Sequence, residues 1–477
     1  MAKHHDPDRN SPVTGPAAPT PFGDALRESV ALGLPKAIAD LSNLVRIPSV
    51  SWEGFDHDHV VASADAVATL ARDTGVFDEV DIVRLPIPAS GELGLPAVIA
   101  TRQARNGRPT VLLYAHHDVQ PPGDDDNWNS KPYEPTLRGD RLFGRGAADD
   151  KAGVMAHIGA IRALLTVNSE PDVGIVLFAE GEEEFGSRSL PAILERFHDR
   201  LAADAIVVAD SGNWDLETPA LTVGLRGAVA FNMRVSTLDH ASHSGQFGGV
   251  VPDAMLAAIE LLATFWNKDG SVAVKGLDSH EAETPEYGEI QLREETGLLD
   301  GVEPIGAGDL LSRTWYQPSI TVTGIDAPSV RNASNTLIPS VRVRVSARVA
   351  PGQKARDYFE KLETHIMRNV PHGAQIQIED LDLGEPFLVD TSGWAAEDAL
   401  DALRESFGRE PVLMGSGGSI PFIADLVERY PAAQILITGV EDPDARAHSP
   451  NESLHLPTFQ HAILAEALLL ARLDARA

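Results

Sequence analysis

The sequence predicts an α/β protein. Its larger domain has a mainly parallel sheet, and a smaller α+β domain is inserted in the chain between the two parts of the larger one. Its 477 residues exceed what a single hydrophobic core usually organises, so two domains are expected. Three short apolar runs have the composition of buried parallel strands, and a helical pattern separates the first two. Further along the chain, strict alternation of apolar and polar residues marks a strand with one buried face.

Residues 22–227 alternate helical and strand patterns and are expected to form the first part of the larger domain. The preceding stretch, 1–21, is polar and Pro-rich, has no apolar signal segment, and is expected to be a disordered tail. A helical pattern then leads to Val45 and ends before Pro48. The predicted buried strands are TVLLYA (110–115), VGIVLFA (173–179) and AIVVA (205–209), with a helix at 151–165 between the first two. This β-α-β order favours a parallel sheet.

Residues 228–386 are expected to form the inserted domain, because their pattern has the β-α-β-β-α-β order of a ferredoxin-like sandwich. The clearest strand is 341–349, where four valines and an alanine share one face and Arg348 lies on the other. The segment 267–316 is rich in Gly and Glu and is predicted to be a long irregular insertion loop. Helical and strand patterns return in 387–477, so the larger domain is expected to be discontinuous.

The composition excludes several classes of function. Lys and Arg number 39 against 70 Asp and Glu, a formal charge of −31 that repels the phosphates of nucleic acids. No apolar run is long enough to span a membrane, and the protein is expected to be cytoplasmic, without a membrane partner. The chain has no cysteine, which excludes disulfides and thiolate chemistry, so a metal site would have to use His, Asp and Glu.

Acidic or imidazole side chains follow all three predicted buried strands. They are His116 and Asp118 after the first, Glu180 and Glu182–Glu184 after the second, and Asp210 after the third. Each one alone is more typical of a cap or a solvated loop. Because adjacent parallel strands direct their carboxyl ends into one crevice, the coincidence favours a shared site. A dense group of carboxylates needs a cation to stay ionised, and His with several carboxylates suits zinc, with manganese or cobalt as alternatives.

Motifs along the chain resemble those of the co-catalytic dizinc amidohydrolases. That family includes carnosinase-like dipeptidases, aminoacylases, acetylornithine deacetylase, succinyl-diaminopimelate desuccinylase and glutamate carboxypeptidases. The matching stretches, in order, are YAHHDVQP, GRGAADDKAG, EGEEEFGS, VVADSG, ASHSGQFGG, GSGGSIP and RAHSPNES. HHDVQP and the Asp of VVADSG favour the carnosinase-like branch. The resemblance implies that the larger domain is a zinc-peptidase catalytic domain and the insert a lid and dimerisation domain.

The resemblance also implies two zinc ions per chain and assigns their ligands. The ligands would be His116 and Asp210 for one zinc, Glu184 and His448 for the other, and Asp149 as the bridge between them. Two ions held in this way lower the pKa of a shared water and polarise the substrate carbonyl.

Three neighbours of the ligands receive roles from the same resemblance. Asp118 would orient the imidazole of His116 and raise its basicity. Glu183 would be the general base that takes a proton from the attacking water and passes it to the leaving amine. His117 occupies a variable position of the family and is expected to have no catalytic role. The resemblance also implies that the Asp149–Asp150 peptide bond is cis.

Four further residues are expected to contact the substrate. His243 would stabilise the oxyanion in the site of the partner subunit of a homodimer, although alone it looks like a turn residue in a Gly-rich loop. Arg348 would bind the substrate's C-terminal carboxylate, although a surface arginine is the commoner interpretation of such a position. Asn335 would add a hydrogen bond, and Ser419, before a helical stretch, suits carboxylate binding at a helix N-terminus.

These features predict a dizinc dipeptidase of broad specificity. The alternative is the same chemistry on N-acyl amino acids, as in a deacetylase or desuccinylase. A dipeptidase requires the free ammonium of its substrate, whereas a deacylase rejects it. A third hypothesis, a metal-binding protein without catalysis, is disfavoured because a protein that only binds metal has no use for a base such as Glu183.

Overall fold

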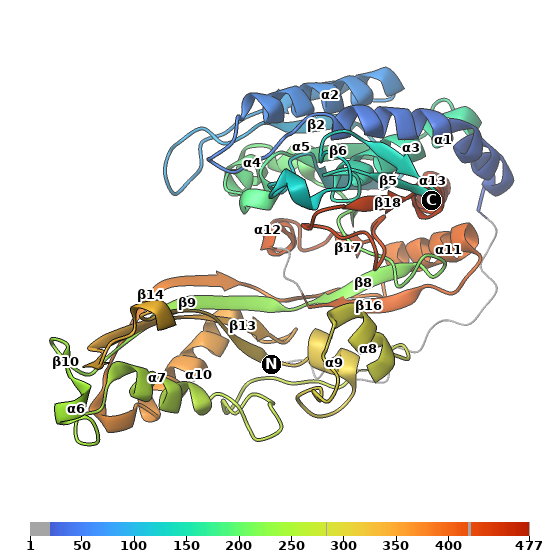
Figure 1. Ribbon diagram of the computed structural model, residues 1–477. Helices are drawn as coiled ribbons and strands as arrows, with labels where there is room; N and C mark the ends of the chain where they lie inside the picture. Colours follow the sequence, from blue (N-terminus) through green and yellow to red (C-terminus); the bar gives the residue numbers. More distant parts are fainter. Residues whose placement is uncertain (1–19, 283, 418–420, 477) are drawn as a thin grey trace. The chain divides into compact units, whose positions relative to one another are not determined.

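The structure is a computed structural model that describes residues 20–282, 284–417 and 421–476 (Figure 1). All but the last two residues of the predicted tail therefore lie outside the described residues. The described residues form two compact units. The first contains those up to Val223, with 389–414 and 425–476, and the second contains 224–388 with the described part of 415–424.

The first unit is built on a sheet with parallel central strands. In spatial order the strands are β1 (Glu79–Val83), β2 (Ala97–Arg102), β6 (Gly174–Glu180), β3 (Thr110–His116), β7 (Ala205–Val208), β17 (Gln434–Ile437) and β8 (Ala220–Leu225). β6, β3, β7 and β17 pair in parallel, and β1 and β2 are antiparallel additions at one edge. The three predicted buried strands are confirmed as β3, β6 and β7, with bounds within one residue of the prediction.

Helices cover this sheet because its central strands are apolar on both faces. They are α1 (Gly23–Val45), α2 (Asp58–Thr74), α3 (Lys151–Val167), α4 (Leu190–Arg196), α5 (His198–Leu201), α11 (Trp394–Phe407), α12 (Pro421–Arg429) and α13 (Leu456–Ala475). α3 packs between α1 and α13 as well as on β3, so most of its residues are buried (Figure 1).

A small three-stranded sheet joins two segments of the first unit that are far apart in sequence. Its strands are β4 (Thr136–Arg138), β5 (Arg141–Phe143) and β18 (Ser453–His455), in the order β18-β5-β4. β18 pairs with β5, and this pairing places the loop after β5 beside the loop before β18.

The second unit contains a four-stranded antiparallel sheet with two helices packed on it. In chain order its elements are β9 (Gly227–Ser236), α7 (Ala254–Ala263), β11 (Ser319–Asp326), β13 (Ser340–Val349), α10 (Ala355–Arg368) and β14 (Gln375–Gly384). This is the predicted β-α-β-β-α-β order, and the spatial order of the strands is β11-β13-β9-β14. The alternating apolar residues of β13 are buried in one core with α7 and α10. The short strands β15 (Phe387–Leu388) and β16 (Val412–Ser416) pair with β8.

The prediction of an irregular loop at 267–316 was wrong in two places. The segment contains α8 (Glu289–Thr296) and α9 (Leu310–Trp315). α8 buries none of its residues, so it lacks the apolar periodicity from which a helix is predicted. α9 is a short helix capped by Asp309, whose side chain accepts a hydrogen bond from the Ser312 N–H at 2.8 Å.

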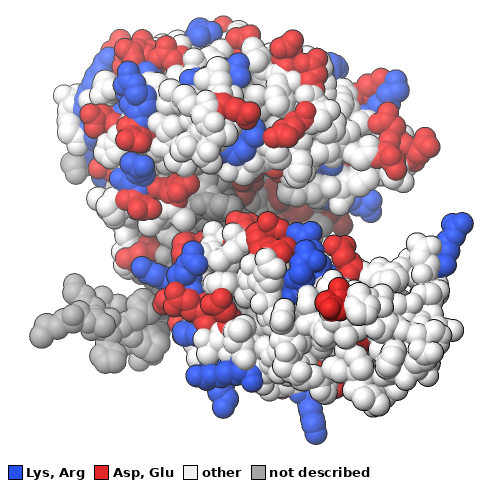
Figure 2. Space-filling view, turned by 90° about the vertical axis from the view of Figure 1, so that its left-hand side faces the viewer, with Lys and Arg blue, Asp and Glu red and all other residues white. Residues whose placement is uncertain are grey.

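The surface charge and the composition of the helices can be described for the same residues. Acidic side chains are scattered over the face shown in Figure 2 and interspersed with Lys and Arg. Among the described residues, no helix has both the length and the apolar composition needed to cross a membrane.

Candidate active site

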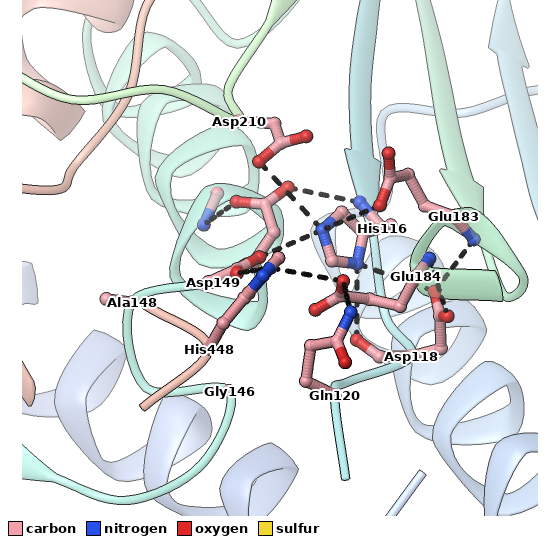
Figure 3. Close-up of polar contacts among 12 residues, drawn as sticks. His116, Asp118, Gln120, Gly146, Ala148, Asp149, Glu183, Glu184, Asp210 and His448 are labelled. Atoms are coloured by element: carbon pink, nitrogen blue, oxygen red, sulfur yellow. Dashed lines mark hydrogen bonds and ion pairs between the residues drawn. The ribbon is translucent and has the colours of Figure 1, made fainter. Parts of the chain in front are cut away.

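The candidate site lies at the carboxyl ends of three neighbouring parallel strands (Figure 3). His116 ends β3 and pairs in register with Glu180, which ends β6. Glu183 and Glu184 follow in the 3-10 helix η3 (Glu183–Phe185), and Asp210 lies just beyond β7. The strand order therefore brings these side chains to one edge of the sheet, as expected for an open α/β fold.

Asp149 stands between the two histidines of the site (Figure 3). Its Oδ1 lies 3.1 Å from Nε2 of His116, and its Oδ2 lies 3.0 Å from Nε2 of His448. Asp210 Oδ1 lies 3.9 Å from the same nitrogen of His116, and Glu184 Oε2 lies 3.2 Å from the same nitrogen of His448. Asp149 is thus shared by the two imidazoles, and each imidazole has at least one further carboxylate near its Nε2.

Asp118 connects the first imidazole to the acidic loop. Its two carboxylate oxygens accept hydrogen bonds from the backbone N–H groups of Glu183 (3.2 Å) and Glu184 (3.1 Å). Nδ1 of His116 lies 3.2 Å from the Asp118 carbonyl oxygen and 3.4 Å from its Oδ1. These contacts hold the His116 ring with Nε2 directed at Asp149, which is the arrangement that a metal-ligating histidine needs.

Asp150, the residue after Asp149, anchors helix α3 to strand β3. The Asp149–Asp150 peptide bond is cis, as the family resemblance implies. Asp150 Oδ2 accepts a hydrogen bond from the His116 N–H (3.1 Å), and Oδ1 accepts one from the Gly153 N–H (3.2 Å). A Cβ at Gly153 would lie 2.1 Å from Asp150 Oδ1, so only glycine permits this close approach.

The buried acids of the site are costly to ionise together. Burial, followed by the charges of Asp210 and Glu184, raises the pKa of Glu183 well above its usual range, although His116 opposes this. Burial likewise raises the pKa of Glu184 to about 7 and that of Asp210 to about 6. Hydrogen bonds to Asp149 and Glu184 raise the pKa of His448 to about 11. Positive charge brought among these groups would let the acids stay ionised.

The chemistry of the donor set fits a pair of divalent metal ions. Two groups of potential ligand atoms each lie within 4.8 Å of one another: His116 with Glu183 and Asp210, and His116 with Asp149 and Glu184. The donors are imidazole nitrogens and carboxylate oxygens only, the set that suits zinc, manganese or cobalt. Glu183 belongs to the first group, and its Oε2 lies 4.0 Å from Nε2 of His116.

His117 takes no part in this donor set. Its side chain is fully buried, and its Nε2 lies 3.0 Å from the Pro96 carbonyl oxygen. Burial lowers its pKa to about 4, so the ring stays neutral. This packing role agrees with the expectation that His117 is a bystander.

Three of the four predicted substrate residues are described, and all three lie in the second unit. His243 is exposed in strand β10 (Ser242–His243), and its Nδ1 accepts a hydrogen bond from the Gly245 N–H at 3.0 Å, which caps α6 (Ser244–Phe247). β10 pairs with β12 (Thr336–Leu337), and the Ser244 N–H donates to the Asn335 carbonyl oxygen at 3.0 Å. The structure therefore brings His243 and Asn335 together. Ser419 lies outside the described residues.

Arg348 has a second guanidinium near it that sequence analysis missed. Arg226, just before β9, is 8% exposed, and its Nη1 lies 3.3 Å from the Gln317 carbonyl oxygen. Burial, then the charge of Arg348, lowers the pKa of Arg226 to about 10. Within the described parts of the chain, neither arginine has an acidic ion-pair partner. Two like charges without a counterion favour an anionic ligand.

Two further side chains with no predicted role contact the site. Gln120 Nε2 donates to Glu184 Oε2 at 2.7 Å (Figure 3). Glu452 accepts a hydrogen bond from the Asp149 N–H at 3.1 Å. Both belong to motifs quoted above, YAHHDVQP and RAHSPNES. A polar residue inside such a motif that has no assigned role is the feature of the sequence from which they could have been found.

Comparison with known proteins gives one family and several relatives. The model of peptidase family M20/M25/M40 matches residues 112–472. The cysteinylglycine-S-conjugate dipeptidase of Corynebacterium striatum is 33% identical over 378 residues, 78% of this chain and 83% of the relative. The human Beta-Ala-His dipeptidase is 29% identical over 82% of this chain and 80% of its own length. The solved structure of the dipeptidase Dug1p from Saccharomyces cerevisiae has the same fold, with a TM-score of 0.78, 23% identity and coverage of 95% of this chain and 99% of that one.

Proposed function

The chain belongs to peptidase family M20/M25/M40 and is a metallopeptidase, and from this premise we propose that it hydrolyses dipeptides that have a free C-terminal carboxylate. The proposal depends chiefly on the placement of Asp149. Its two oxygens face different imidazoles, so one carboxylate could be shared by two metal ions. Relatives named as dipeptidases support the choice of substrate. The alternative is hydrolysis of N-acyl amino acids with the same chemistry.

We propose zinc as the metal, with manganese or cobalt as alternatives, because the donors are histidine and carboxylate. His116, Asp149 and Asp210 would hold one ion, and Asp149, Glu184 and His448 the other. When bound, such a pair supplies a water of lowered pKa and polarises the substrate carbonyl.

The protein's own residues would then move the proton and hold the charge. Glu183 accepts the proton of the attacking water and delivers it to the leaving amine, since its carboxylate lies beside the His116 ligand at 4.0 Å. Asp118 keeps the base in place through the backbone N–H of Glu183. His243 of the partner subunit donates to the oxygen that develops negative charge at the carbonyl.

The substrate's carboxylate would be received by Arg348, with Asn335 and Ser419 as further donors. Two observations support a site for an anion in this unit. Arg348 lies on the polar face of β13, opposite Ser319 of β11, and it has no acidic partner among the described residues. Arg226 adds a second, nearly buried positive charge close by. A carboxylate would neutralise this pair and could accept two parallel hydrogen bonds from one guanidinium.

A panel of related substrates tests this proposal. Amidation of a dipeptide's C-terminus is expected to lower kcat/KM by about 10- to 100-fold, because a charged hydrogen-bond acceptor is lost. The metal-loaded enzyme would be assayed on a dipeptide, its amide, a tripeptide and an N-acetyl amino acid.

Variants of one strand provide the control for this panel. Arg348→Met should remove the preference for the free acid, whereas Arg344→Met, on the same face of β13, should leave it intact. Equal rates on acid and amide in the wild-type enzyme would remove Arg348 from this role. Faster hydrolysis of the N-acetyl amino acid than of the dipeptide would favour the alternative function.

We further propose that the working unit is a homodimer formed by the second unit. Large apolar side chains are exposed in the segment that follows His243. They are Phe247 (48%) at the end of α6, Val250 (86%) in the loop after it, and Leu256 (43%) and Ile259 (57%) on α7. Several exposed apolar side chains in one short segment favour an interface with another protein surface. A twofold-related copy would cover them and would carry each His243 towards the other chain.

Mixing two inactive variants tests whether His243 acts across the interface. Glu183→Gln and His243→Ala should each be nearly inactive as homodimers. When they are co-expressed, half of the randomly formed dimers are mixed and one site in each is complete, so about a quarter of wild-type activity should return. The measurement is the specific activity of a preparation whose mixed dimers are counted by native mass spectrometry. If His243 acts within its own chain, mixed dimers form and no activity returns.

A further inference from the structure

The carboxylate of Glu452 holds one loop through four hydrogen bonds. It is fully buried. Its Oε2 accepts from Arg145 Nη1 (2.6 Å) and the Gly146 N–H (3.1 Å), and its Oε1 accepts from the N–H groups of Ala148 (2.9 Å) and Asp149 (3.1 Å). All four donors belong to residues 145–149, the loop that ends in Asp149. The carboxylate of Glu452 thus fixes the backbone from which Asp149 projects.

Glu452 itself belongs to the segment that presents His448. Three residues of this segment have left-handed backbone angles that are uncommon without glycine: Arg446 (φ 57°), His448 (φ 60°) and Asn451 (φ 65°). Such a conformation persists where the surroundings impose it. Asn451 is held by the Asn129 N–H at 2.8 Å, and the Glu452 carbonyl oxygen accepts from the Gly144 N–H at 3.0 Å. The segment is therefore fixed on both sides of Glu452.

We propose that Glu452 is a positioning residue that holds the Asp149 loop and the His448 segment in one fixed relation, so that the metal ions meet a preformed set of ligands. This inference rests on the proposed metal centre but not on the substrate. Glu452 would act by holding the loop and not by touching a metal ion, because both of its oxygens are occupied by the four donors of residues 145–149. Its effect would therefore appear in metal affinity before it appears in chemistry.

The arrangement requires a carboxylate and not merely a polar group. Each oxygen of Glu452 faces two donors, and glutamine has an NH₂ group in place of one oxygen. Whichever way the amide is turned, two hydrogen bonds are lost and donors face donors. Arg145 is 1% exposed, so the change also leaves a buried guanidinium without its counterion.

Titration of metal into metal-free protein tests the proposal. Glu452→Gln is expected to weaken zinc binding by about 10- to 100-fold, the range typical of changes to groups that orient metal ligands. Calorimetry or a competing chelator would measure the affinity, and circular dichroism would establish that the variant is folded.

Asp474 provides a matched control on stability. It lies on α13 and accepts from the backbone N–H groups of Asp172 (2.5 Å) and Val173 (2.9 Å), in the loop before β6. Asp474→Asn should lower the melting temperature without changing zinc affinity. If Glu452→Gln loses stability in the same way yet binds zinc with wild-type affinity, Glu452 is merely structural and the proposal is overturned.

A second variant serves if Glu452→Gln does not fold. Glu452→Asp keeps the charge beside Arg145 but withdraws the oxygens by one methylene, and it should bind zinc more weakly than the wild-type protein. Wild-type affinity in this variant would refute the positioning role. Absence of metal binding in the wild-type protein would instead refute the proposed function, so the two failures are distinguishable.

Discussion

Replacing Glu183 with glutamine is expected to lower kcat by about 10²- to 10⁴-fold while leaving the metal content unchanged, because glutamine keeps the shape of the side chain and cannot accept a proton. The backbone N–H of Glu183 donates to the Asp118 carboxylate, so a change of the Glu183 side chain does not remove that hydrogen bond. The side chain is 16% exposed and lies 4.0 Å from Nε2 of His116, so solvent can reach it beside the potential metal ligands. The measurement is kcat at saturating dipeptide, with metal content determined by elemental analysis.

The adjacent acid provides the control for this experiment. Glu184 lies 3.2 Å from His448 and receives a hydrogen bond from Gln120, so Glu184→Gln should chiefly weaken metal binding. Excess metal should then restore part of the activity of Glu184→Gln and none of that of Glu183→Gln. A near-wild-type kcat for Glu183→Gln would show that another group is the base.

Removal of metal is expected to abolish activity, and zinc, cobalt or manganese should restore it with two ions bound per chain. Without a cation, repulsion and burial would make the acids of the site take up protons, as the raised pKa values of Glu184 and Asp210 indicate. A bound metal would also supply the activated water, so turnover is expected to stop without it. The activity of chelated and dialysed protein, before and after addition of each metal, measures the effect.

Calcium is the control metal for this reconstitution. It prefers six to eight oxygen ligands, whereas this site offers an imidazole nitrogen from His116 and another from His448. Calcium should therefore fail to restore activity at concentrations at which zinc succeeds. Full activity in protein that elemental analysis finds free of metal would contradict the proposed mechanism.

Much of the fold could be predicted because local patterns encode it. The apolar runs that became β3, β6 and β7 are long enough to identify buried strands, and the alternation in β13 identifies a strand with one buried face. Helix α8 was missed for the opposite reason, because none of its residues is buried and its sequence has no apolar period. The positions of His116 and Asp210 followed from their place just after predicted strands.

The sequence by itself determined the residue types available for chemistry and the strand ends at which they lie. Only the tertiary structure decided that the two oxygens of Asp149 face different histidines, and that Arg226 lies near Arg348. It also brought Glu452 to the loop of Asp149, across 303 positions of the chain. The physical reason is that strand and helix periods arise from neighbours in sequence and leave a repeating pattern. A hydrogen bond between distant segments depends on how the whole chain packs, and it leaves no period to detect.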